Sequence, residues 1–250
     1  MNRFVSLLFA LALAACTPPA PPEPAKLTVA AASNLTGVLD EIAAASHKET
    51  GIRIVLSYGS TAQLSQQIGN GAPFDVFAAA DTEHVDQLVS KGLVVANSRA
   101  IYARGQLALW VPNGEKLGVR EFKDLARPEV RFVAVAQPAL APYGKAAVEA
   151  MKSAGLWVAL QPKIVYANNI NMAKQYAGTG NADAAFTAYS LVFRETGAVL
   201  TIDPKLYPPI DQALGVVASS KQRERARQFT AFLLGAEGRA KLLRGGYLVP

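Results

Sequence analysis

The stretch LTVAAASNLTGVLDEI (residues 27–42) contains the pattern that decides the fold. Residues 27–31 form a short apolar run typical of a buried strand, and the polar turn Ser33-Asn34 follows soon after. Apolar residues then recur at the i, i+3, i+4 and i+7 spacing of one helix face: Leu35, Val38, Leu39 and Ile42. The stretch therefore predicts a strand, a polar turn and the start of a helix, in that order.

The same order recurs at three further turns, Ser60-Thr61, Pro142-Tyr143-Gly144 and Asn168-Asn169. Short apolar runs alternate with helix-like segments along most of the chain, and these runs cover residues 27–31, 52–58, 74–80, 107–111, 130–136, 164–167, 184–188 and 214–218. Such alternation predicts an α/β fold, with parallel sheets and helices on both faces of each sheet.

The position of the polar turns indicates a binding site. In α/β domains, ligands lie in the crevice beyond the carboxyl ends of the strands. A helix that begins there offers unpaired N–H groups and about half a positive charge to an anion. One such turn alone is usually only a helix cap. Four of them, two in each half of the chain, predict a two-sided cleft for a small, fully ionised oxyanion.

The residues that the turns lack exclude several kinds of site. Apart from Lys145, which we interpret as solvent-exposed, the turns carry no charged residue and no histidine. An amino-acid site would need an Arg and an acid, and a metal site would need paired Tyr, His or carboxylate ligands. We interpret His47 and His84 as surface residues and Asp81 as the cap of a helix that begins at residue 82. The sequence therefore predicts no catalytic residues, no metal-ion site and no cofactor.

The N-terminus reads as a targeting segment. Residues 4–15 are apolar except for Ser6, which is too short a run to cross a membrane and fits a signal peptide over residues 1–15. Leu13-Ala14-Ala15-Cys16 resembles a bacterial lipobox, so we expect lipidation of Cys16. Residues 16–25 then form a Pro-rich tether. These features predict an extracytoplasmic protein that is held at a membrane by its lipid.

Two clusters of helix and strand breakers, at residues 111–114 and 207–210, suggest a division into two lobes. We place the crossovers near residues 106 and 213. Lobe 1 would then comprise residues 26–106 plus 214–250, and lobe 2 residues 107–213. Two such connections would let the lobes close over a ligand.

The positive charge of the chain does not indicate a nucleic-acid partner. The formal net charge is +6, but the basic residues are scattered. Their densest group precedes Phe229 in an amphipathic segment, where a solvated helix face is the simpler interpretation: Lys221, Arg223, Arg225 and Arg227. Nucleic-acid binding would need a basic stripe with interleaved aromatic residues, which the sequence lacks.

At the polar turns, the chain resembles the periplasmic molybdate-binding protein family of ABC importers. The matching motifs run from residue 31 to residue 247: AASNL (31–35), YGST (58–61), NGAPFDVF (70–77), AAD (79–81), APYG (141–144), AN (167–168) and GY (246–247). The resemblance implies a two-lobed periplasmic binding-protein fold of type II, in which each lobe has a mixed, mostly parallel sheet with flanking helices.

The resemblance also implies which residues bind the oxyanion. The ligand positions of the family fall on Ser33, Asn34, Thr61, Tyr143 and Ile170 of this sequence. Ser33 and Thr61 would give hydroxyl and backbone donors, Asn34 an amide, and Tyr143 and Ile170 mainly backbone N–H groups. We expect three further residues to lie behind this set: Ser60, Asn169 and Tyr189.

Two departures from the family pattern concern this set. Thr61 stands where relatives commonly have Ser, so that a methyl group is added to the cavity. Ala188 stands near the position where one branch of the family has a ligand tyrosine, and Tyr189 follows it.

The predicted function is therefore capture of molybdate, and also of tungstate, by a monomeric solute-binding protein that delivers the anion to an ABC permease. Two alternatives remain. One is a binder of another tetrahedral oxyanion such as sulfate or phosphate. The other is an α/β hydrolase that uses Ser33 or Ser60, which is disfavoured because the turns offer no histidine as a base.

Overall fold

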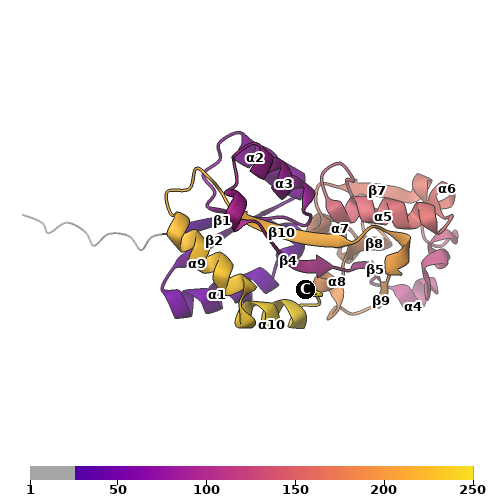
Figure 1. The fold of residues 1–250 in the computed structure, drawn as a ribbon. Helices are drawn as coiled ribbons and strands as arrows, with labels where there is room; N and C mark the ends of the chain where they lie inside the picture. Colours follow the sequence, from indigo (N-terminus) through magenta and orange to yellow (C-terminus); the bar gives the residue numbers. More distant parts are fainter. Residues whose placement is uncertain (1–25, 250) are drawn as a thin grey trace, which may run out of the picture.

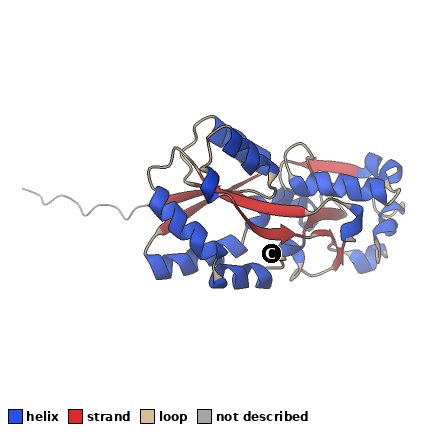
Figure 2. Cartoon of the chain, viewed as in Figure 1, coloured by secondary structure: helices blue, strands red, loops and turns tan. Residues whose placement is uncertain are grey.

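A computed structural model describes residues 26–249, so the predicted signal peptide, Cys16 and the tether lie outside the described residues. The chain folds into two lobes that lie side by side, each a β-sheet with helices packed against it (Figures 1 and 2). Within the described residues, no helix is both long enough and apolar enough to span a membrane.

The sheet of lobe 1 has five strands in the order β2-β1-β3-β10-β4. Its strands are β1 (Lys26–Ala32), β2 (Arg53–Gly59), β3 (Val76–Ala78), β4 (Ala100–Gly105) and β10 (Ile210–Val216). Strand β1 pairs in parallel with β2 and β3, whereas β10 runs antiparallel to β3 and β4. Parallel pairing places the carboxyl ends of β1, β2 and β3 at one edge of the sheet, which faces lobe 2 (Figure 1).

The sheet of lobe 2 repeats this plan in the order β7-β6-β8-β5-β9. Its strands are β5 (Leu107–Val111), β6 (Val133–Ala136), β7 (Ile164–Ala167), β8 (Ala184–Ala188) and β9 (Ala198–Thr201). Strand β6 is parallel to β7 and β8, and β5 is antiparallel to β8 and β9. The expected mixed sheets are confirmed, with two of the four pairings in each sheet being parallel.

Helices cover both sheets. Those of lobe 1 are α1 (Val38–Thr50), α2 (Thr61–Gly69), α3 (Glu83–Ser90), α9 (Arg223–Leu234) and α10 (Ala236–Arg244), with the 3-10 turns η1 (Ser33–Leu35) and η2 (Ala96–Ser98). Those of lobe 2 are α4 (Gly114–Leu117), α5 (Pro142–Ser153), α6 (Trp157–Leu160), α7 (Ile170–Gly178) and α8 (Tyr189–Val192), with η3 (Phe122–Ala126) and η4 (Gln161–Lys163). The turn η5 (Pro204–Leu206) lies on the return path to lobe 1.

The chain passes between the two sheets twice. The first passage is a single residue, Gln106, between β4 and β5. The second lies between Thr201, where β9 ends, and Ile210, where β10 begins. The return that we predicted near residue 213 therefore falls inside β10. Helices α9 and α10 then complete lobe 1 (Figure 1).

All eight predicted strands are present, but β4 and β9 were missed. Both are edge strands that are only partly buried, and β4 also carries Arg104 on its solvent side, paired with Asp211. Their apolar runs, residues 100–103 of β4 and 198–200 of β9, are short and were not distinguished from loop segments.

A close approach fixes the start of α5. A Cβ atom at Gly144 would overlap the carbonyl oxygen of Ala136, the last residue of β6. Glycine therefore lets the first turn of α5 lie directly against the end of this strand, which places Tyr143 at the lobe interface.

We expect Gly144→Ala to lower the free energy of unfolding by about 1–3 kcal/mol, because either the helix or the strand end must shift. Urea denaturation of the two proteins measures this difference. Gly69→Ala is the matched control, since Gly69 also lies in a helix and a Cβ there would meet no atom within 4 Å. Equal stability of the Gly144→Ala variant and the parent would contradict the close approach.

Candidate functional site

The strand ends of lobe 1 pack directly against lobe 2. Ala32 is the last residue of β1, and Ala80 lies two residues after the end of β3. Both belong to the same buried apolar cluster as Tyr143 and Ile170 of lobe 2. The turn η1 also contacts α7 and α8. The lobes are therefore closed upon each other at the edge where the sequence analysis places the binding site.

Lobe 1 contributes three of the predicted binding residues at this interface. Ser33 and Asn34 form η1 directly after β1, and Thr61 is the first residue of α2. All three are at least 95% buried. The Thr61 hydroxyl oxygen accepts a hydrogen bond from Ala80 N at 3.1 Å, so its own proton is free to be donated elsewhere.

Lobe 2 contributes the other two predicted residues. Tyr143 lies in the first turn of α5, and Ile170 is the first residue of α7; both are buried. Helix α2 is also tied to lobe 2, because Ala62 N donates to the carbonyl of Leu140 at 3.1 Å. The structure thus brings the five predicted residues to one interface, although their role as ligands remains a prediction.

The helix starts at this interface leave backbone donors unpaired. First-turn N–H groups have no acceptor within their own helix. Among the described residues, the N–H groups of Thr61, Tyr143 and Ile170 also find no acceptor elsewhere. These three donors are buried and belong to both lobes, so an anion between the lobes would satisfy groups that otherwise cost free energy.

The three residues expected behind the site, Ser60, Asn169 and Tyr189, make different kinds of contact. Asn169 caps α7 by accepting from Met172 N at 2.9 Å, and the Ser60 hydroxyl donates to Gln63 Oε1 at 2.8 Å. The ring of Tyr189 lies against Phe193 and Gly246, and the backbone N–H of Tyr189 donates to Gln106 O. Their expected supporting role is a proposal that these contacts permit.

A buried hydrogen-bond network adjoins Asn34, and the sequence analysis missed most of it. Asn34 Nδ2 lies 2.9 Å from Gln212 Oε1 and 3.0 Å from the hydroxyl of Tyr247. Gln212 Nε2 donates to the Tyr143 hydroxyl at 3.0 Å, and the Tyr102 hydroxyl donates to Gln212 Oε1 at 2.8 Å. The Tyr143 hydroxyl thus accepts from Gln212, and the backbone N–H of Tyr143 is the unpaired group that we expect to face a ligand.

The C-terminus completes this network across the lobes. The Tyr247 hydroxyl donates to Asn34 O, and the Ser190 hydroxyl of lobe 2 lies 3.1 Å from the Tyr247 hydroxyl and 3.2 Å from Asn34 O. Burial raises the pKa of Tyr102, Tyr143 and Tyr247. The three hydroxyls therefore keep their protons at neutral pH.

The interface holds no buried charge. Among the described residues that are buried, Asp75 is the one ionisable acid or base other than tyrosine. It lies at the opposite end of the sheet, where it accepts hydrogen bonds from Thr28 N and Ser220 Oγ. No group of three His, Cys, Asp or Glu residues in the described chain is placed to hold a metal ion.

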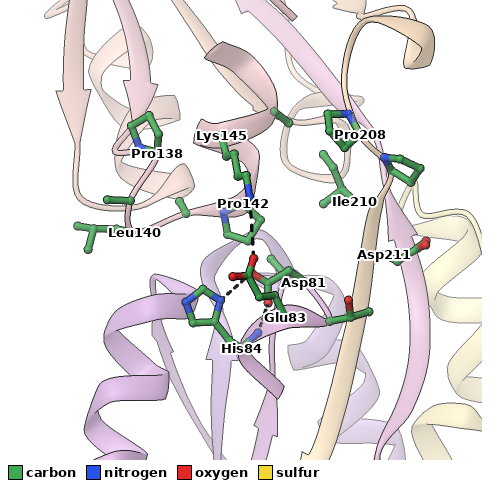
Figure 3. Close-up of a pocket in the computed structure, with 16 residues that line it drawn as sticks. Asp81, Glu83, His84, Pro138, Leu140, Pro142, Lys145, Pro208, Ile210 and Asp211 are labelled. Carbon is green, nitrogen blue, oxygen red and sulfur yellow. Dashed lines mark hydrogen bonds and ion pairs between the residues drawn. The ribbon is translucent and has the colours of Figure 1, made fainter. Parts of the chain in front are cut away.

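A cavity of about 770 Å³ opens beside the interface, between α3 of lobe 1 and the start of α5 in lobe 2 (Figure 3). His84 on its wall hydrogen-bonds Asp81 through Nδ1 at 2.8 Å, and Asp81 also accepts from His84 N, which fits its expected capping role. The interpretation of His84 as a surface residue was wrong, because it is half-buried against this acid. His47 is exposed, as expected.

An ion pair crosses the mouth of this cavity. Lys145 Nζ of lobe 2 lies 3.8 Å from Glu83 Oε2 of lobe 1, and both side chains are largely exposed (Figure 3). The expected exposure of Lys145 is confirmed. An exposed pair of this kind contributes about 0–1 kcal/mol, so it adds little to holding the lobes together.

Comparisons with known proteins agree with this architecture. A family model described as "Bacterial extracellular solute-binding protein" matches residues 27–248. The molybdate-binding protein ModA of Rhodobacter capsulatus is 34% identical over 224 residues, which cover 89% of this chain and 88% of the relative. ModA of Azotobacter vinelandii is 34% identical over 229 residues, which cover 89% and 90%.

A solved structure shows the same fold. The periplasmic molybdate-binding protein of A. vinelandii superposes with a TM-score of 0.86 at 32% identity, and the match covers 90% of this chain and 99% of that one. The expected two-lobed binding-protein fold is therefore confirmed. These relatives are named as binding proteins, which agrees with the expectation that the chain is not an enzyme.

The His84–Asp81 contact predicts a pH dependence of stability. The hydrogen bond to Asp81 raises the pKa of His84 above its ordinary value of 6.5, although burial opposes this. A raised folded-state pKa gives stability that is complete below about pH 6.5 and is lost as the pH rises through the folded-state value. We expect His84→Gln to remove this dependence, which should amount to about 1 kcal/mol or less.

Thermal unfolding of the parent and of His84→Gln between about pH 5.5 and 8.5 checks this prediction. The stability advantage of the parent should shrink towards the alkaline end. His47→Gln is the control. Because His47 is exposed, this substitution should leave the pH profile of stability unchanged. A His84→Gln profile parallel to that of the parent would contradict the assignment.

Proposed function

The chain belongs to the bacterial extracellular solute-binding protein family, and on that premise we propose that it captures molybdate, and also tungstate, between its two lobes and delivers the anion to an ABC permease. The observation that carries this proposal is the meeting of unpaired, uncharged donors from both lobes at one buried interface. A binding function also fits the absence of a nucleophile with a neighbouring base among these residues.

We assign the anion contacts to both lobes. Ser33, Asn34 and Thr61 of lobe 1 would donate from hydroxyl, amide and backbone groups. Tyr143 and Ile170 of lobe 2 would donate backbone N–H groups at their helix starts. The anion is then bound only when the lobes are closed, and the closed form is the one that we expect to dock on the permease.

Uncharged donors suit a doubly charged ligand. A buried anion without a counter-ion must be stabilised by several hydrogen bonds, and bonds to a charged acceptor are stronger than neutral ones. A set made only of donors penalises an anion that keeps a proton, because that proton would find no acceptor. Phosphate, which is partly protonated at neutral pH, should therefore bind more weakly than molybdate or tungstate.

Isothermal titration tests the proposal. We expect sub-micromolar molybdate binding by a folded protein that begins at Lys26, with weaker binding of sulfate and phosphate at equal ionic strength. Asn34→Asp should weaken molybdate binding more than about 100-fold, since two like charges about 4 Å apart repel by about 4 kcal/mol near a protein surface. No molybdate binding by the parent, or tighter binding of sulfate, would overturn the proposed ligand.

Asn181→Asp is the matched control for this substitution. Asn181 is exposed in lobe 2, and its side chain bonds only the nearby Thr179 hydroxyl. The same change of charge there should leave the affinity within about twofold of the parent, because exposed charges more than about 10 Å apart are largely screened at 0.1 M salt. Parent-like binding by Asn34→Asp would show that the assigned pocket is wrong.

We further propose that Cys16 carries the lipid anchor and that the protein is a monomer outside its complex with the permease. The Pro-rich residues 16–25 would hold the lobes clear of the membrane, at about 3.1 Å per residue. In cells that process lipoproteins, the parent should partition into detergent, and Cys16→Ser should move to the aqueous phase. Equal partitioning of both proteins would contradict the lipid anchor. The molar mass in solution, measured by light scattering, tests whether the protein is a monomer.

A further inference from the structure

The buried side-chain amide of Gln212 connects Asn34 of lobe 1 with Tyr143 of lobe 2. Gln212 lies on β10 and is fully buried. Its oxygen accepts from Asn34 and Tyr102 of lobe 1, and its nitrogen donates to the Tyr143 hydroxyl of lobe 2. No other buried side chain among the described residues is a glutamine. Each polar atom of Gln212 therefore has a partner.

Asn34 lacks a partner on its other side. Its Nδ2 faces Gln212 and Tyr247, whereas its Oδ1 is buried and accepts from no described residue. Because the two halves of an amide point in different directions, this unpartnered oxygen lies on the side away from Gln212. An oxygen there would repel an anion, whereas an NH₂ group there would bind it.

A simultaneous half-turn of both amides removes the conflict. Gln212 would then donate to Asn34 Oδ1 and to the Tyr102 hydroxyl, and its oxygen would accept from the Tyr143 hydroxyl. The Tyr102 hydroxyl has one proton and lies 2.9 Å from Ala79 O, so it would donate to Ala79 O while it accepts from Gln212. The Tyr247 hydroxyl, which Asn34 Nδ2 contacts at 3.0 Å, would then donate to Asn34 Oδ1 instead of Asn34 O, and the Ser190 hydroxyl would donate to Asn34 O. Every member then has a partner, and the Asn34 NH₂ group takes the place of the unpartnered oxygen.

We propose that Gln212 is a positioning residue for oxyanion capture, which turns the Asn34 amide into a donor and is itself held by the Tyr143 hydroxyl when the lobes close. The inference rests on the proposed function. An anion favours the donor orientation of Asn34, which requires the turned Gln212. Gln212 hydrogen-bonds the Tyr143 hydroxyl of lobe 2 in either orientation, so closure of the lobes fixes the residue that orients Asn34. Binding and closure thus stabilise each other.

The surroundings suit this role. A Cβ atom at Gly105 would lie 2.6 Å from Gln212 Nε2 and would also overlap the Tyr143 hydroxyl, so glycine leaves the space in which these two groups meet. The tyrosine hydroxyls stay protonated, because burial raises the pKa of each. They can therefore act as donor or acceptor in either orientation.

The first test compares Gln212→Met and Gln212→Glu with the parent. Met keeps the length of the side chain without its hydrogen bonds, so molybdate affinity should fall roughly 5- to 150-fold. Glu can only accept when ionised, so it should hold Asn34 Nδ2 towards residue 212 and weaken binding further. The losses should lie mainly in faster dissociation, as measured by stopped flow.

The second test separates this role from simple packing. Tyr143→Phe keeps the backbone N–H proposed for the ligand but removes the hydroxyl, and should raise the dissociation rate roughly 2- to 12-fold. Its effect should not add to that of Gln212→Met in a double-mutant cycle. Tyr207→Phe is the matched control, because its hydroxyl accepts from Leu107 N outside this network. It should leave the dissociation rate unchanged.

Side-chain amide NMR keeps the inference testable if Gln212→Met does not fold. In the parent, the amide signals of Asn34 and Gln212 should shift together on addition of molybdate, and Tyr143→Phe should abolish the shift at Gln212. A parent that binds no oxyanion would overturn the proposed function. A parent that binds molybdate, with Gln212 and Tyr143 variants that bind and dissociate as it does, would overturn only the role of Gln212.

Discussion

The proposed site must hold a small dianion without a counter-ion, and this requirement explains the arrangement of the two lobes. Removing such an ion from water is costly, and only several aligned hydrogen bonds can offset the cost. Helix starts supply these donors without any charged side chain. Here Thr61, Tyr143 and Ile170 begin helices of both lobes, and their N–H groups have no acceptor in the described chain. These N–H groups are the donors that we propose for the anion.

The fold brings these helix starts together through its crossovers. Each sheet has four strands that run in one direction and one strand, β10 in lobe 1 and β5 in lobe 2, that runs against them. Strands β4 and β5 continue one another through Gln106 alone, and β10 returns along the same seam, carrying Gln212 into it (Figure 1). The connection between the lobes thus also contacts two of the proposed binding residues, Asn34 and Tyr143.

Much of this could be predicted from the sequence, because apolar runs and polar turns are local signals. The strand–turn–helix units around Ser33, Thr61 and Ile170 were found in this way. The edge strands β4 and β9 were missed because their apolar runs, residues 100–103 and 198–200, are too short to tell a strand from a loop. Gln212, Ser190 and Tyr102 were missed for another reason. Each is a single polar residue whose partners lie far away in the chain, and only the fold shows that they meet.

A crystal structure with bound tungstate tests the central claim most directly, because the anomalous signal of tungsten locates the anion without ambiguity. The account predicts one site between the lobes, with donors from Ser33, Asn34 and Thr61 on one side and Tyr143 and Ile170 on the other. It also predicts no Lys or Arg within hydrogen-bond distance. Tungsten bound elsewhere, or paired with a basic side chain such as Lys145, would contradict it.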